Sequence, residues 1–80
     1  MSALTLYYRE GCSLCEDMYG ELLRCEQVDA AQLRRVDIDT DPELVRRYDH
    51  KVPVLTGADD EEICHYFLDH QALLGYFATH

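Results

Sequence analysis

The sequence predicts an α/β fold, a four-stranded mixed sheet flanked by three helices in the order β-α-β-α-β-β-α. Two observations indicate this fold. A short apolar stretch is followed by a helical pattern twice, at residues 4–25 and 34–48, and a hairpin pattern with one more helix follows at residues 51–77. Helical connections join parallel strands and short turns join antiparallel strands. The first half of the sheet is therefore expected to be parallel and the hairpin antiparallel, in one domain spanning residues 1–80.

The first unit combines a buried strand with an amphipathic helix. Residues 4–8 are nearly all apolar, as expected for a central strand that is covered on both faces. Further along, apolar side chains recur at spacings of three and four, as on one helix face: Leu14, Cys15, Met18, Leu22 and Cys25. Ser13 is the expected N-cap of this helix, and Glu16 would complete a capping box.

The second unit begins with an alternating strand. Residues 34–39 place Val36 and Ile38 on one face. Either Thr40 or Asp41 is expected to cap the next helix, because Pro42 fits its first turn. Its buried stripe is expected to contain three apolar side chains: Leu44, Val45 and Tyr48. Residues 26–33, between the two units, carry no clear pattern.

The last part of the chain predicts a hairpin and a helix. Residues 51–55 form a strand with Pro53 at its entrance, where a missing N–H is tolerated. Residues 56–60 form a turn and residues 62–67 a fourth strand. Asp69 is expected to cap a final helix with three inward side chains: Leu73, Leu74 and Phe77.

The charge and hydropathy of the chain exclude several function classes. Sixteen acidic residues against seven basic ones give a formal charge of −9, which repels phosphate backbones and anionic membranes. We therefore expect no nucleic-acid and no membrane partner. The apolar runs are too short to span a bilayer and no leader pattern opens the chain, so a cytoplasmic location is expected. Thiols in the cytoplasm are mostly reduced at rest.

The stretch Cys12-Ser13-Leu14-Cys15 carries the clearest chemical signal. Two cysteines three positions apart, at a strand-to-helix junction, can close a disulfide with little movement of the chain. Backbone N–H groups at the start of the helix would point at the Cys12 sulfur and stabilise its thiolate, so Cys12 is predicted to be more acidic than a free thiol. The stretch therefore indicates thiol chemistry.

Two further cysteines are expected to be structural. Cys25 lies on the apolar face of the first helix and Cys64 lies within a strand. A zinc or iron–sulfur site is the weaker alternative, because such sites usually contain a second closely spaced pair. We therefore expect no metal ligands.

Three stretches together resemble the glutaredoxin branch of the thioredoxin fold, and most closely the short bacterial glutaredoxin-like proteins. They are Tyr7-Tyr8-Arg9-Glu10-Gly11-Cys12-Ser13-Leu14-Cys15, Val36-Asp37-Ile38-Asp39 and Val52-Pro53-Val54-Leu55. The resemblance implies that Cys12 is the nucleophile, that Cys15 resolves its mixed disulfide, and that Pro53 is a cis-proline facing them. It also implies a set of substrate-binding positions: Arg9, Gly11, Leu14, Val52 and Pro53.

The chain departs from glutaredoxins where their Gly-Gly pair lets glutathione approach the last helix, because Tyr66 and Phe67 stand there instead. The resemblance implies a small thiol-disulfide oxidoreductase acting on protein or small-molecule disulfides. It would hold no tightly bound cofactor and draw electrons from a reductase or from glutathione, the latter coupling poorly. Two alternatives remain open, a non-catalytic binding or adaptor module of the same fold and a metal- or cluster-binding protein.

Overall fold

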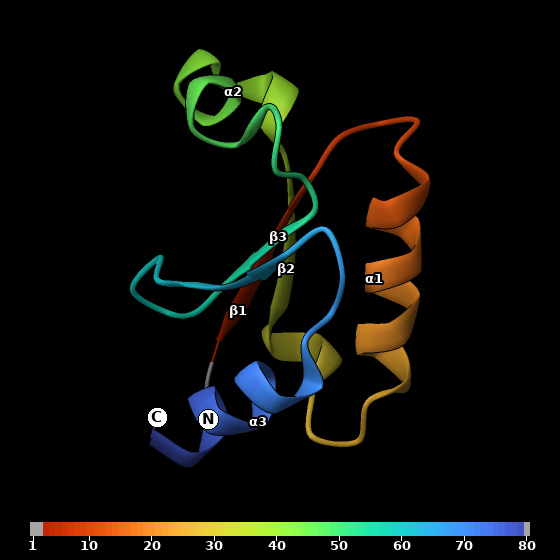
Figure 1. Ribbon diagram of the computed structural model, residues 1–80, viewed down its shortest axis with the longest axis vertical. Coiled ribbons are helices and arrows are strands. Elements are labelled where there is room, and N and C mark those ends of the chain that lie inside the picture. Colours follow the sequence, from red (N-terminus) through yellow and green to blue (C-terminus); the bar gives the residue numbers. More distant parts are fainter. Residues whose placement is uncertain (1–2, 80) are drawn as a thin grey trace.

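The computed structural model describes residues 3–79, and its strands and helices follow the predicted order (Figure 1). The elements are β1 (Leu4–Tyr8), α1 (Ser13–Arg24), β2 (Leu33–Asp37), α2 (Pro42–Tyr48), β3 (Val54–Thr56), β4 (Glu62–His65) and α3 (His70–Thr79). Two 3-10 turns, η1 (Ala30–Gln32) and η2 (Ile38–Thr40), flank β2. Within residues 3–79 no helix is long and apolar enough to cross a membrane.

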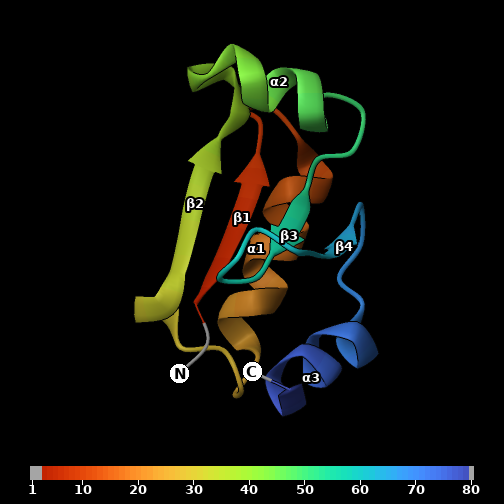
Figure 2. The ribbon, with the colours of Figure 1, turned by 90° about the vertical axis from the view of Figure 1, so that its left-hand side faces the viewer.

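The four strands form one mixed sheet in the order β2-β1-β3-β4. The β1 and β2 strands are parallel, whereas β3 pairs antiparallel with both β1 and β4. The predicted central position of β1 is confirmed, since it lies between β2 and β3 (Figure 2). The predicted change from parallel to antiparallel pairing at the hairpin is confirmed as well.

Helices cover both faces of the sheet because side chains of β1 alternate between two apolar clusters. On one face, strand residues pack with α1 and α3 in a cluster of Leu4, Leu6, Met18, Leu22, Leu55, Cys64, Leu73 and Tyr76. On the other face, the sheet packs with α2 and η2 in a cluster of Tyr7, Ile38, Tyr48 and Val54. The result is the thioredoxin-like fold that the sequence predicts.

Of two local predictions about helix ends, one differs from the structure and one is confirmed. The N-cap of α1 is Cys12 rather than Ser13, and the Cys12 sulfur accepts the capping hydrogen bond. Of the two candidates for α2, Asp41 is the N-cap, because its side chain accepts a hydrogen bond from the Glu43 N–H.

Two apolar side chains also differ from their predicted places. Leu74 is half exposed, and Tyr76 takes the inward position beside Leu73. Ile38 is buried as predicted, but it lies in η2, after β2 has ended.

Strands β3 and β4 are shorter than predicted at one end. Residues 51–53 precede β3 instead of forming its first half, and residues 66–67 follow β4 instead of ending it. The predicted Asp69 cap of α3 is confirmed, because its carboxylate accepts a hydrogen bond from the Ala72 N–H at 3.0 Å. The two irregular segments, 51–53 and 66–67, lie at the end of the sheet at which β1 ends and the loop to Cys12 begins.

Candidate functional site

Three loop segments meet at one end of the sheet. In the strand register, Tyr7 lies opposite Val54, and Val54 lies opposite His65. The segment that follows β1, the segment that precedes β3 and the segment that follows β4 are therefore neighbours. This register brings residues 9–12, 49–53 and 66–67 to the end of the sheet at which α1 begins.

The cysteine pair lies where the chain turns from β1 into α1. Gly11 has a φ of +77°, a conformation that glycine adopts without steric cost, and it turns the chain into the N-cap residue Cys12. Cys12 and Cys15 form a disulfide, with their Cα atoms 5.2 Å apart. The Cys15 backbone N–H lies 3.1 Å from the Cys12 sulfur, so the start of α1 provides a hydrogen bond to that sulfur.

The two sulfurs differ in their access to solvent. Cys12 is partly exposed, whereas Cys15 is only 1% exposed and belongs to the inward face of α1. Leu14, between them, is also partly exposed. Cys12 is therefore the more accessible of the two residues, and Cys15 lies within one helical turn of it.

The Val52–Pro53 segment approaches the site from β3. The Val52–Pro53 peptide bond is cis and Pro53 is buried. The Val52 N–H donates to the Tyr48 carbonyl at 3.2 Å, so this N–H is engaged within the chain. The Pro53 carbonyl accepts the Tyr66 N–H at 2.9 Å, which connects the segment to the end of β4.

Arg9 connects the end of β1 with two acidic residues. Its guanidinium binds Asp39 with two parallel hydrogen bonds, Nη2 to Oδ1 at 2.9 Å and Nε to Oδ2 at 3.1 Å. Its Nη1 binds Asp49 Oδ1 at 2.6 Å. The hydrogen bonds that Arg9 donates to Asp39 and Asp49 raise the pKa of its guanidinium.

Two aromatic residues occupy the segment after β4. Tyr66 has a φ of +65°, and its hydroxyl donates to the His50 carbonyl. Phe67 is 69% exposed. Both side chains lie where the sequence lacks the glycine pair of glutaredoxins, so they add bulk to this side of the site.

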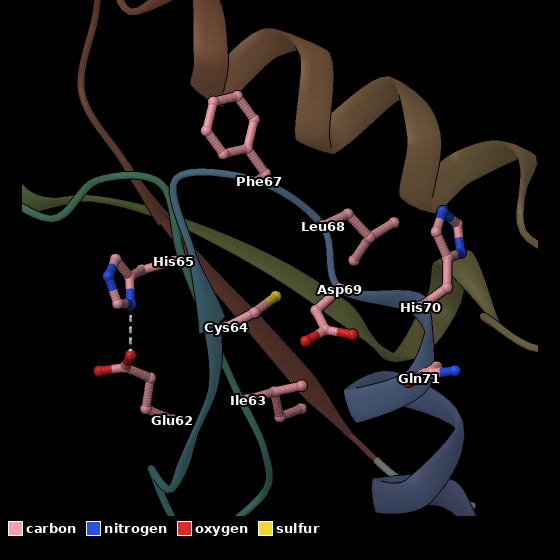
Figure 3. Close-up of a pocket in the computed structure, with 9 residues that line it drawn as sticks. All are labelled: Glu62, Ile63, Cys64, His65, Phe67, Leu68, Asp69, His70 and Gln71. Atoms are coloured by element: carbon pink, nitrogen blue, oxygen red, sulfur yellow. Dashed lines mark hydrogen bonds and ion pairs between the residues drawn. The ribbon is translucent and has the colours of Figure 1, made fainter.

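An open pocket of about 690 Å³ lies beyond this segment, between β4 and the start of α3 (Figure 3). Phe67 and Leu68 line one side, and the Glu62–His65 hydrogen bond of 2.7 Å lies on another. Glu62 also pairs with Lys51 at 2.6 Å, and these two partners hold the pKa of the Glu62 carboxyl below its usual range. This ion pair holds the side chain of Lys51, the residue before Val52, against Glu62 of β4.

The two remaining cysteines, Cys25 and Cys64, are free thiols. Cys64 is buried in the cluster beneath α1 and α3, and burial raises the pKa of its thiol. Cys25 is the C-cap of α1, partly exposed, and its thiol donates to the Gln27 side chain at 3.1 Å. Within residues 3–79 no group of three or more His, Cys, Asp or Glu residues is arranged to hold a metal ion.

The sequence prediction did not include Asp39, Asp49 or the backbone conformation of Tyr66 at the site. The Arg9–Asp39 and Arg9–Asp49 pairs join residues 30 and 40 positions apart, and no local periodicity reports such pairs. The available signal for Tyr66 was its place in the segment where the resemblance to glutaredoxins implies a glycine pair, because glycine tolerates positive φ.

Comparisons with known proteins support a family assignment. The solution NMR structure of protein Ne2328 from Nitrosomonas europaea is 39% identical, with a TM-score of 0.82 over 94% of this chain and 89% of that one. The X-ray structure of protein XcR50 from X. campestris is 33% identical, with a TM-score of 0.74 over 98% and 99%. A malarial protein that is 14% identical shares the fold, with a TM-score of 0.65 over 100% of this chain and 97% of that one.

No curated protein matches the chain. The model of the glutaredoxin-like domain (DUF836) matches residues 3–77, which include every segment of the site described above. The chain belongs to the glutaredoxin-like domain (DUF836) family.

Proposed function

We propose that the protein is a small thiol-disulfide oxidoreductase that reduces or exchanges disulfides through the Cys12–Cys15 dithiol. The observation that carries this proposal is the difference in solvent exposure between Cys12 and Cys15. Cys12 is partly exposed at the N-cap of α1 with a backbone N–H 3.1 Å from its sulfur, and Cys15 is buried one turn behind. A helix N-terminus stabilises a thiolate, which is the attacking species in disulfide exchange.

The proposed reaction has two exchange steps. In the reduced protein, the Cys12 thiolate attacks one sulfur of a substrate disulfide, a mixed disulfide forms on Cys12, and the first substrate thiolate leaves. The Cys15 thiolate then attacks the Cys12 sulfur, the Cys12–Cys15 disulfide forms, and the second substrate thiolate leaves. The substrate gains two electrons and the protein loses two, which an external thiol donor, a reductase or two molecules of glutathione, must restore.

The substrate in this proposal is a protein or small-molecule disulfide, bound between Cys12 and the Val52–Pro53 segment. In this proposal the substrate also passes Gly11 and Leu14. Gly11 precedes Cys12 in the loop, and Leu14 lies in the first turn of the helix that Cys12 caps. A cytoplasmic location suits the proposal, since the dithiol would be reduced at rest there. We expect a thioredoxin reductase to restore it faster than glutathione, because Tyr66 and Phe67 add bulk beside the site.

Single-cysteine variants test the proposal. The reduced protein is mixed with bis(2-hydroxyethyl) disulfide, and the thiol released in one round of exchange is followed together with the protein mass. We expect the Cys12→Ser variant to release no thiol and the Cys15→Ser variant to accumulate a mixed disulfide on Cys12. The control is Cys25→Ser, which removes a partly exposed thiol outside the site and should leave thiol release unchanged.

Full thiol release by the Cys12→Ser variant would overturn the proposal. Absence of thiol release by the wild-type protein, with a Cys12 thiol that alkylating reagents do not label near neutral pH, would favour a binding module instead. Supplying either glutathione with its reductase or thioredoxin reductase alone then identifies the electron donor.

A further inference from the structure

The Arg9 side chain joins three segments that are distant in sequence. Arg9 follows β1, Asp39 lies in η2 after β2, and Asp49 is the C-cap of α2. The contacts with Asp39 form a parallel pair of hydrogen bonds, the geometry that a planar guanidinium and a carboxylate favour. The shorter contact, 2.6 Å from Nη1 to Asp49, completes the set. One side chain thereby fixes the relative positions of β1, η2 and the end of α2.

The Asp49 contact extends to the Val52–Pro53 segment through a tight turn. The Asp49 N–H donates to the Val45 carbonyl at 2.9 Å, and the N–H groups of Lys51 and Val52 donate to the Tyr48 carbonyl at 2.8 and 3.2 Å. These hydrogen bonds connect Asp49 and Val52 within one turn. A shift of the Asp49 side chain would therefore also move the Val52 backbone.

On its other side, Arg9 is close to the reactive cysteine in the chain. Two residues, Glu10 and Gly11, separate it from Cys12, and Gly11 has the positive φ at which the loop turns. Few backbone hydrogen bonds constrain such a loop, so a side-chain anchor at its start limits how far the cysteine can move. Arg9 thus links both halves of the site, the Cys12 loop and the turn that leads to Pro53.

The same contacts determine the charge that a substrate meets at Arg9. One guanidinium faces two carboxylates, so the group of three side chains carries a net formal charge of about −1 at neutral pH. Asp39 and Asp49 occupy three of the five guanidinium N–H groups, so a substrate carboxylate would have to bind the remaining two beside both aspartates. Like charges at this range repel, so the group disfavours anionic substrates.

We propose that Arg9 is a positioning residue that holds the Cys12 loop against the Val52–Pro53 segment, and that Asp39 and Asp49 withhold its guanidinium from substrate carboxylates. This inference rests on the proposed function and narrows its substrate class. The site selects neutral or cationic disulfides over disulfides that carry carboxylates near the sulfur, such as oxidised glutathione.

A cycle of variants tests the specificity part. Turnover of oxidised glutathione and of neutral bis(2-hydroxyethyl) disulfide is measured at high salt, which screens long-range charge effects. In Asp39→Asn/Asp49→Asn, the kcat/KM for oxidised glutathione divided by that for the neutral disulfide should rise several-fold. Adding Arg9→Met to this double variant should abolish the rise. Arg9→Met in the wild-type background should change the ratio little. An equally large effect of Arg9→Met in both backgrounds would show that Arg9 already binds substrate carboxylates and would overturn the proposal.

The positioning part has its own measurement. With the neutral disulfide, Arg9→Met should lower kcat while KM stays close to the wild-type value, and Arg9→Lys should restore part of the loss, because an ammonium can pair with one carboxylate. Arg46→Met is the matched control, since Arg46 pairs with Glu43 on the surface of α2. Equal losses of kcat in Arg9→Met and Arg46→Met would contradict a positioning role.

A binding experiment separates this inference from the proposed function. S-methylglutathione carries glutathione's carboxylates but no exchangeable sulfur, and NMR follows the Arg9 Nε–H resonance during its addition. The resonance should stay in place in the wild-type protein and move in Asp39→Asn/Asp49→Asn. Movement in the wild-type protein would overturn the inference. In the same spectra Arg9→Met should shift the amide resonances of both Cys12 and Val52, whether or not the protein reduces any disulfide.

Discussion

Tyr66 donates its backbone N–H to the Pro53 carbonyl at 2.9 Å while it holds a φ of +65°. A side chain in this left-handed conformation costs about 1–2 kcal/mol relative to glycine. Tyr66 is nevertheless retained there by contacts at both ends, since its hydroxyl donates to the His50 carbonyl. The end of β4 and the segment before β3 are thereby connected through one strained residue.

Replacement of Tyr66 by glycine and by alanine isolates this strain. Both variants lose the ring and its hydroxyl, and they differ in the methyl group that opposes positive φ. We expect Tyr66→Gly to be more stable than Tyr66→Ala, with a free energy of unfolding about 1 kcal/mol higher in urea denaturation. An alanine variant at least as stable as the glycine variant would show that the backbone relaxes out of the left-handed region.

Gly11 provides a second test of a backbone requirement, directly before Cys12. Its φ of +77° disfavours any side chain, although a methyl group there would meet no atom within 4 Å. We expect Gly11→Ala to destabilise the protein by about 1 kcal/mol. Gly75→Ala is the matched control, because Gly75 lies in helical backbone of α3 with equally open space. That variant should gain up to about 1 kcal/mol from helix propensity, and a loss in both variants would contradict a conformational cause at Gly11.

The four thiols of the reduced protein should differ in reactivity. Cys12 is partly exposed at a helix N-terminus and should react first with iodoacetamide near neutral pH. Cys25 should follow at an ordinary rate, while Cys64 should react slowest, because burial shields its sulfur and raises the pKa of its thiol. A time course by mass spectrometry with peptide mapping gives the order.

The oxidised protein serves as the control for this labelling. Its Cys12–Cys15 disulfide should protect both residues, and Cys25 should keep its rate. Labelling of Cys64 faster than Cys25 would mean that the cluster beneath α1 and α3 opens more readily than its packing implies.

Tyr7 makes stability depend on pH in the alkaline range. Burial, with a hydrogen bond of 2.9 Å to Asp60, raises the pKa of the Tyr7 phenol from 10.0 to about 12. Between these values the unfolded chain releases a proton that the folded chain retains, so the free energy of unfolding falls as pH rises. The stabilisation is fully present below about pH 10 and is lost through about pH 12, at up to about 1.4 kcal/mol per pH unit.

Urea denaturation on either side of this window measures the effect. Tyr7→Phe keeps the ring, which stacks on Tyr48 at 4.6 Å between centroids, and removes the titrating group. We expect the variant to lose less stability than the wild-type protein as pH rises, with the pKa of Tyr48, also raised by burial, contributing to the slope that remains. Identical slopes would show that Tyr7 titrates normally.

The parts of the fold that could be predicted from sequence are those with a local period. The apolar stretch Leu4–Tyr8 and the inward stripe of α1 are examples, because burial on a strand or on one helix face leaves a repeating pattern in neighbouring residues. The stripe of α3 was less predictable. Apolar residues occupy almost every position from 72 to 78, so periodicity alone did not distinguish exposed Leu74 from buried Tyr76.

Helix capping and the surroundings of the cysteines could not be predicted in the same way. Serine is a much better N-cap than cysteine by intrinsic preference, yet the turn at Gly11 places the cap at Cys12. The cysteine motif and the Val-Pro pair could be recognised in the sequence because each is short and contiguous. The Arg9 contacts could not be predicted, because they join residues 30 and 40 positions apart that meet only in the folded chain.

The central position of β1 also has a consequence for biosynthesis. Its parallel partner β2 follows within the first half of the chain, but its other neighbour, β3, begins at Val54. A ribosome-bound chain that lacks residues 54–65 therefore presents β1 as an open sheet edge, with unpaired N–H and C=O groups that invite aggregation. The last third of the chain closes that edge, so truncated translation products of this small protein should be the species that chaperones or proteases must handle.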